Sequence, residues 1–221
     1  DSFLFNNVDS VVVAAAGNDG KISFLNSVTG IGQSKNAIVV GSTINAAIFL
    51  RSNEIDLSDF SSRGYTIDNR TKPDLVAPGQ YIFSTYGMSE EDSVPHCDTD
   101  MTLDTSALSV ESGTSFAAPV IAGLLALIKQ YLLDGFYPHG CPSSNRIEHT
   151  GILLKAIIIN SCEPIRGKLK FGSFFTQNLS ALPVPNPLFG YGIPKLDATG
   201  LKLPTSSKEF IFGFLDNITS Y

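Results

Sequence analysis

The chain has 221 residues, of which 43% are hydrophobic and 16% charged, and its formal net charge is -6. This composition is typical of a globular domain and excludes a disordered or fibrous chain. The acidic balance gives no basic face for a phosphate backbone, so we expect no nucleic-acid partner. The longest apolar stretch, residues 116–128, contains Pro119 and is shorter than the roughly 18 residues of a membrane span. We therefore expect no membrane span.

The chain opens at Asp1 with neither an initiator Met nor a signal segment, which indicates a processed or truncated product. Its three cysteines, Cys97, Cys141 and Cys162, are an odd number with no metal-binding spacing. One disulfide with one free thiol, or three free thiols, both remain open.

Short patterns for N-glycosylation begin at Asn69, Asn178 and Asn217. Such patterns also arise by chance in chains of this length. They favour a secreted chain, or one in the lumen of an endomembrane or vacuolar compartment.

Short apolar runs that end in turn residues recur along the first 85 residues, as expected of strands buried on both faces of a parallel sheet. Four such runs occupy residues 11–16, 37–40, 74–77 and 81–85. Two later segments, residues 114–133 and 152–161, are predicted helices because apolar residues cover almost their whole surface. Strands mixed with buried helices predict a layered α/β/α fold with a mostly parallel sheet.

The segments between these elements are irregular. Residues 86–112 are acidic and without a period, which predicts a long surface loop inserted in a domain of residues 1–203. Residues 169–187 end with prolines at alternate positions, which favours an extended connection. Residues 204–221 are interpreted as a tail or as the start of a further β module.

Ser115 stands where the sequence turns from small residues into the apolar helix at 114–133. The free N–H groups and the positive dipole end of a helix start favour negative charge, and the small neighbours Gly113, Ala117 and Ala118 leave room for a substrate carbonyl. A serine before a helix is more often a simple N-cap. By itself, this pattern leaves both interpretations open.

Five motifs in order resemble those of the subtilase family, over roughly residues 8–201. The segment from Gly113 to Pro119 (GTSFAAP) is similar to the serine motif of that family. The other four are Val11 to Asn18 (VVVAAAGN), Ser34 to Gly41 (SKNAIVVG), Phe60 to Gly64 (FSSRG) with Lys72 to Gly79 (KPDLVAPG), and Gly190 to Gly192 (GYG) with Leu196 to Ala198 (LDA). The resemblance implies the C-terminal part of a subtilisin-like peptidase domain, incomplete at its N-terminal side.

The resemblance also implies roles for single residues. Ser115 would be the nucleophile of a serine endopeptidase, and the Asn18 side chain with the Ser115 backbone N–H would bind the oxyanion. Without the serine motif, Asn18 would be read as a turn residue. The implied substrate-binding residues are Ala15, Ala16, Gly17, Asp19, Gly113 and Thr114. Asp19 would stand at the rim of the specificity cleft, where it favours basic or polar substrate side chains unless it is merely a solvated turn residue.

A catalytic serine also needs a histidine base and an orienting aspartate, which precede it in the family order of Asp, His and Ser. Both would lie in a segment upstream of Asp1, since His96, His139 and His149 all follow Asn18. We therefore expect the isolated chain to be nearly inactive. Its partners would be a polypeptide substrate and that upstream segment.

Two alternatives belong to other functional classes. A pseudopeptidase would keep the fold as a binding or scaffold module. A nucleotide-binding α/β protein is disfavoured because no glycine-rich phosphate motif follows a strand. No cofactor is expected, and no metal site is predicted because the acidic residues of 86–112 lack a regular ligand spacing.

Overall fold

The computed structural model describes residues 1–45, 54–85, 108–172 and 175–195. The predicted tail at 204–221 and all but the last residues of the predicted insertion at 86–112 lie outside this part of the chain. So do Cys97, His96 and Asn217.

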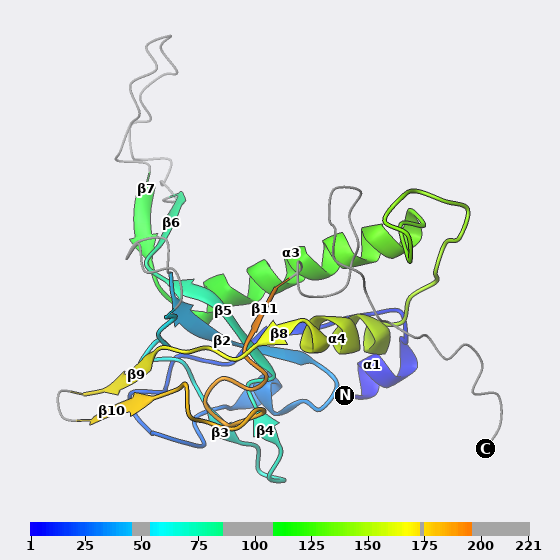
Figure 1. The fold of residues 1–221 in the computed structure, drawn as a ribbon. Helices are drawn as coiled ribbons and strands as arrows, with labels where there is room; N and C mark the ends of the chain where they lie inside the picture. The colour runs from blue at the N-terminus through cyan, green and yellow to red at the C-terminus, as the bar shows by residue number, and fades with distance from the viewer. Residues whose placement is uncertain (46–53, 86–107, 173–174, 196–221) are drawn as a thin grey trace, which may run out of the picture.

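Three parallel strands form the central sheet, in the order β1, β2, β5 (Figure 1). Their bounds are Val13–Ala15 for β1, Ile38–Ile44 for β2 and Leu75–Gln80 for β5. Ala14 pairs with Val39, and Gly41 pairs with Val76. Because β2 is covered on both faces, its residues are apolar or small, and all but the last are buried. The predicted α/β fold with a parallel sheet is confirmed.

One face of the sheet is covered by α3 (Thr114–Leu133), with α4 (Gly151–Asn160) beside it (Figure 1). α3 contacts all three strands of the sheet. Its buried residues include Ala117, Ile121, Leu125 and Ile128, a spacing of four, four and three that places them on one stripe of the helix.

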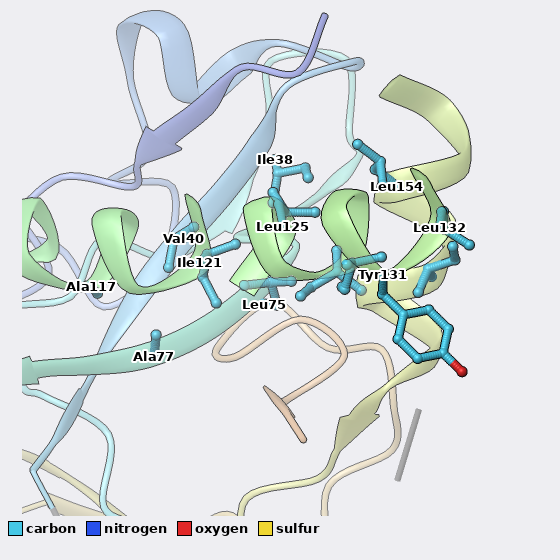
Figure 2. Packing of buried hydrophobic residues seen from close by; sticks show 13 residues of the cluster. Ile38, Val40, Leu75, Ala77, Ala117, Ile121, Leu125, Tyr131, Leu132 and Leu154 are labelled. Carbon is cyan, nitrogen blue, oxygen red and sulfur yellow. The ribbon is translucent and has the colours of Figure 1, made fainter. Parts of the chain in front are cut away.

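The main hydrophobic core lies between α3 and the sheet, as Figure 2 shows for the side chains that meet there. Ile121 and Leu125 of α3 pack over Ile38 and Val40 of β2 and Leu75 of β5. All five side chains are at most 5% exposed, so this contact removes most of their apolar surface from water.

The opposite face of the sheet is covered, in the described part of the chain, by loops and a hairpin. Val76 of β5 packs there with Leu57, Leu169 and Phe189 in a second buried cluster. The hairpin consists of β9 (Lys168–Phe171) and β10 (Phe175–Asn178). Residues 169–187 were predicted to be irregular, and that prediction is wrong for the hairpin, whose Leu169 packs in this cluster.

A second correction concerns residues 81–85. They form a strand, β6 (Ile82–Thr85), but it pairs antiparallel with β7 (Leu108–Glu111) in a hairpin that projects from the body (Figure 1). The prediction that this run belongs to the parallel sheet is therefore wrong. Its short apolar pattern does not distinguish a sheet strand from a hairpin strand.

The remaining elements are short. They are α1 (Ser2–Asn6), η1 (Gly30–Gln33), β3 (Gly64–Tyr65), β4 (Thr71–Lys72), β8 (Cys162–Glu163) and β11 (Ile193–Pro194). β3 pairs antiparallel with β4, and β11 with β8.

A buried ion cluster joins α4 to the sheet. Asp74, just before β5, accepts a hydrogen bond from Lys72 Nζ at 2.6 Å, and Lys155 Nζ of α4 lies 3.4 Å from its other oxygen. Asp74 also accepts the N–H of Val39 at 2.8 Å. Burial lowers the pKa of Lys72, and the charge of Asp74 opposes that shift.

By length and composition alone, α3 could cross a membrane. In this structure it instead packs along the sheet as a core helix, with α4 beside it. The core covers one stripe of its apolar surface, and 39% of an 18-residue window of the helix is buried.

Candidate active site

The predicted catalytic residues come together at the carboxyl ends of the parallel strands. Asn18 follows β1 after Gly17, and Ser115 lies in the first turn of α3. The N–H of Gly113 donates to the carbonyl of Gly79 in β5 at 2.8 Å, which places the start of α3 beside that strand. This edge of a parallel sheet is where ligands of such folds bind.

Thr114 connects the two segments. Its side chain is fully buried, and its hydroxyl donates to Asn18 Oδ1 at 3.0 Å while accepting the N–H of Gly17 at 3.2 Å. The N–H of Thr114 donates to the same Asn18 oxygen at 3.0 Å. The Asn18 amide is thereby oriented, with its oxygen occupied and its NH₂ group turned elsewhere.

The Asn18 NH₂ group lies near Gly113. A Cβ atom placed on Gly113 would lie 3.5 Å from Asn18 Nδ2 and 3.7 Å from the backbone nitrogen of Ser115. Two N–H donors therefore border the same space, which glycine leaves open. This is the arrangement that a developing oxyanion requires.

Ser115 is exposed, and its hydroxyl makes no hydrogen bond within the described part of the chain. As a residue of the first helical turn, it has a backbone N–H without an intrahelical acceptor. The positive end of the α3 dipole adds to the favourable potential for a negative oxygen.

Gly17 adopts a positive φ of 108° between β1 and Asn18. A Cβ atom at this position would lie 2.9 Å from the hydroxyl of Ser62. A side chain is therefore excluded by both backbone conformation and space. The chain can turn sharply here and present Asn18 at the surface.

The predicted substrate-binding residues divide into an exposed and a buried group, and Gly113 and Thr114 are buried. Ala15 and Gly17 are half-buried and Asp19 is exposed, so these three border the solvent-accessible edge. Ala16 is only 2% exposed, and its side chain packs with Val28 and Val39.

Neither described histidine is close to Ser115. His139 follows the C-terminal end of α3, and a helix of 20 residues is about 30 Å long. His149 lies in a small pocket beside Leu125 and Lys129, about 15 Å along the same helix. Within the described residues, the serine therefore has no histidine base.

The described residues contain no candidate metal site, and a large cavity among them lies away from Ser115 and Asn18. Among the described residues, no group of three or more His, Cys, Asp or Glu side chains could hold a metal ion. A cavity of about 630 Å³ lies at the ends of β2 and β5 and is lined in part by Ile44, Asp56, Gln80 and Lys168, but by none of the predicted site residues. It is therefore not the predicted specificity cleft.

Comparison with known proteins identifies the family. The sequence model of the Subtilase family matches residues 4–192. The chain belongs to the subtilase family. The predicted family is thus confirmed, over a range that includes the first four motifs and Gly190 to Gly192 of the fifth, and the family is one of serine peptidases.

The relatives of this subtilase chain are much longer than the chain itself. It is 40% identical over 131 residues to the serine protease/ABC transporter B family protein tagD of Dictyostelium discoideum, a match that covers 59% of the chain and 7% of that protein. It is 35% identical over 124 residues to the serine protease AprX of Bacillus subtilis (strain 168), which covers 54% of the chain and 26% of AprX.

Among solved structures, the patellamide maturation protease PatA aligns with 90% of the subtilase chain and 53% of its own chain, at a TM-score of 0.50 and 19% sequence identity. This likeness concerns the fold. The chain therefore corresponds to about half of that solved protease chain.

Motif residues without a predicted catalytic role also shape the site. Thr114 was predicted to bind substrate, but its hydrogen bonds to Asn18 and Gly17 were not predicted. Ser62 and Arg63 were noted only as part of a motif, yet both contact the turn that carries Asn18. Contacts between residues more than 40 positions apart have no local signal in the sequence.

Proposed function

We propose that this chain provides the nucleophile and the oxyanion donors of a subtilisin-type serine endopeptidase. The observation that carries the proposal is the small space beside Gly113, bordered by Asn18 Nδ2 and the Ser115 nitrogen. It lies next to an exposed serine at a helix start, so nucleophile and donors serve the same carbonyl group.

The reaction begins when the Ser115 oxygen attacks the carbonyl carbon of the peptide bond. The hydroxyl proton passes to a histidine, and the carbonyl oxygen becomes an oxyanion that accepts hydrogen bonds from Asn18 Nδ2 and the Ser115 N–H. The histidine then protonates the leaving amine as the C–N bond breaks and an acyl-enzyme remains. Water, deprotonated by the same histidine, releases the acid and restores the serine.

The histidine and its orienting aspartate come, in this proposal, from an upstream segment of the same protein. β1 has a strand partner on one side only within the described residues, and Val120 and Leu127 of α3 are 42% and 55% exposed. An added layer beside β1 and α3 would bury such surfaces. The substrate is a polypeptide, and Asp19 at the rim favours basic or polar side chains. Action outside the cell or in an endomembrane lumen fits this function.

A fluorophosphonate probe tests the proposal because it reacts only with a serine activated by a base. We expect one adduct by intact-mass analysis on the complete polypeptide, lost in Ser115→Ala. The isolated 221-residue chain should give no adduct, since a serine without its base retains only the oxyanion and binding contributions.

An adduct on the isolated chain would show that a base is present within it and would contradict the proposed division of the triad. Failure of the complete polypeptide to react would contradict peptidase function and favour the pseudopeptidase alternative.

A further inference from the structure

The turn that carries Asn18 is held on both sides by Ser62. The N–H of Ser62 donates to the carbonyl of Gly17 at 2.9 Å. The Ser62 hydroxyl accepts the N–H of Asp19 at 3.0 Å. Thus one residue, 44 positions along the chain, binds the residue before Asn18 and the residue after it.

Arg63 binds the next residue of the same turn. Its Nη2 donates to the carbonyls of Gly20 and Asp59, both at 2.7 Å, and its Nε donates to the carbonyl of Phe24 at 3.1 Å. A planar guanidinium reaches several acceptors in fixed directions. Arg63 therefore fixes the path of the chain directly after Asn18.

Aromatic rings cover this guanidinium. Its carbon lies 5.7 Å from the centre of the Phe24 ring and 5.8 Å from that of Phe171 in β9. The two rings meet edge to face at 5.5 Å. Both distances to the cation are within the range of cation–π attraction, so the hairpin β9–β10 holds Arg63 against the turn.

The burial of Arg63 is costly. The residue is 0% exposed, its Nη1 has no partner within the described residues, and its hydrogen bonds are to neutral carbonyls. Burial lowers its pKa to about 10, against the opposing charge of Asp59. Lys72, also buried, has the carboxylate of Asp74 as partner. An apolar side chain would fill the position of Arg63 with a smaller desolvation penalty. We therefore explain the buried guanidinium by the carbonyl groups of Gly20, Phe24 and Asp59 that it binds.

We propose that Ser62 and Arg63 are positioning residues that hold the Asn18 amide in place for oxyanion stabilisation. Thr114 orients the amide plane of Asn18 from one side, and Ser62 and Arg63 hold its backbone from the other. This inference rests on the proposed oxyanion role of Asn18.

The test is a double-mutant cycle on the complete polypeptide, with kcat and KM measured on a peptide substrate. Arg63→Lys keeps the charge, but a single ammonium cannot reproduce the fork of donors to Gly20 and Phe24. We expect kcat to fall about 10- to 100-fold with KM nearly unchanged, because a displacement of the donor on the order of 1 Å has such an effect.

Asn18→Ala provides the second side of the cycle. In subtilisin, loss of such a donor lowers kcat by about 10²–10³-fold, and we expect the same here. If Arg63 acts through Asn18, then Arg63→Lys has no further effect on kcat when Asn18 is already alanine.

Ser62→Ala is a second variant that is milder for folding. It removes only the acceptor of the Asp19 N–H, and we expect kcat to fall about 5-fold, the equivalent of one hydrogen bond. Its matched control is Ser61→Ala, since the equally buried Ser61 hydroxyl accepts the N–H of Ser42 in β2 instead. The control for Arg63→Lys is Arg70→Lys, because Arg70 Nη2 donates to the carbonyl of Gln33, away from the turn.

Each outcome has a defined meaning. Losses of kcat in Arg63→Lys and Ser62→Ala that vanish in the Asn18→Ala background, with unchanged controls, support the inference. Losses that multiply with that of Asn18→Ala, or a fall in thermal stability without a fall in kcat, overturn it and leave the proposed function intact. A normal kcat in Asn18→Ala itself contradicts the oxyanion role, and the inference with it.

Discussion

Single atoms decide whether the start of α3 can work as an oxyanion site. Thr114 donates twice to the oxygen of the Asn18 amide, so the amide has one orientation, and Asn18 Nδ2 and the Ser115 nitrogen lie 3.5 Å and 3.7 Å from the place of a Cβ on Gly113. The absence of a side chain at Gly113 keeps the space between these donors open. The proposed site therefore depends on the Thr114 hydroxyl and on the missing side chain of Gly113 as much as on Ser115.

Gly113→Ala tests this view. Gly113 has an extended backbone with a φ of 167°, and the added methyl would lie 3.5 Å or more from its nearest neighbours. We expect the free energy of unfolding to change by less than about 0.5 kcal/mol, as for substitutions without strain. The methyl would, however, occupy the place of the substrate oxygen, and kcat of the complete polypeptide should fall about 100-fold or more.

Urea unfolding and steady-state kinetics measure the two effects separately. Ala118→Gly, which removes a methyl group packed against the main core, is the comparison for kcat, and its glycine within α3 should lower stability by about 1 kcal/mol. Normal turnover in Gly113→Ala would contradict the assignment of the oxyanion space.

Among the elements, α3 links catalysis to the fold. Its first turn carries Ser115, while its middle forms the core with β2 and β5 (Figure 2). A helix anchored by a buried stripe holds its N-terminus in place on the sheet edge. The stability of this stripe and the position of Ser115, the proposed nucleophile, are therefore coupled.

Ile121→Ala and Leu127→Ala form a matched pair on this helix. Ile121 is 0% exposed and Leu127 is 55% exposed. We expect Ile121→Ala to lower the free energy of unfolding of the chain by about 2–5 kcal/mol, through lost burial and a cavity. Leu127→Ala should change it by about 0.5 kcal/mol or less. Equal losses in urea unfolding would mean that the buried stripe of α3 is wrongly assigned.

At the scale of the whole molecule, the described residues centre on a three-stranded parallel sheet with a helical layer on one face. The matched segment spans only 7% of tagD and 26% of AprX. The peptidase activity proposed here accordingly belongs to a larger polypeptide. Stability, in contrast, can be measured on the chain itself.

The pH dependence of that stability is predictable from Cys162, which donates to the carbonyl of Ile158 at 3.3 Å. Burial raises the pKa of its thiol from 9.0 to about 12. Below pH 9 the thiol is protonated in both states. Above pH 9 the unfolded chain loses the proton first, so stability falls as the pH rises toward 12.

Urea unfolding at pH 8 and pH 10 measures this effect, with Cys162→Ala as the reference for all other groups. We expect the parent chain to lose about 1 kcal/mol more than the variant between these two pH values. An identical pH dependence of the two proteins would show that the thiol is not buried as described.

Much of the site was predictable from local patterns. The runs before Gly17 and after Ser115 are apolar because β1 and α3 are buried, and the turn residues between such runs mark where side chains reach the surface. The α/β fold follows from the same patterns. The hairpins β6–β7 and β9–β10 were not predicted correctly, because a short segment of sequence does not indicate which other segment it pairs with.

The sequence by itself determined the family, the order of the motifs and the identity of Ser115 and Asn18 as candidates, since these depend on residue type and spacing along the chain. Only the tertiary structure decided that Thr114 orients Asn18, that Ala16 faces the core, and that Arg63 holds the turn. Such contacts join residues far apart in the sequence. They depend on how the elements pack, which no local pattern records.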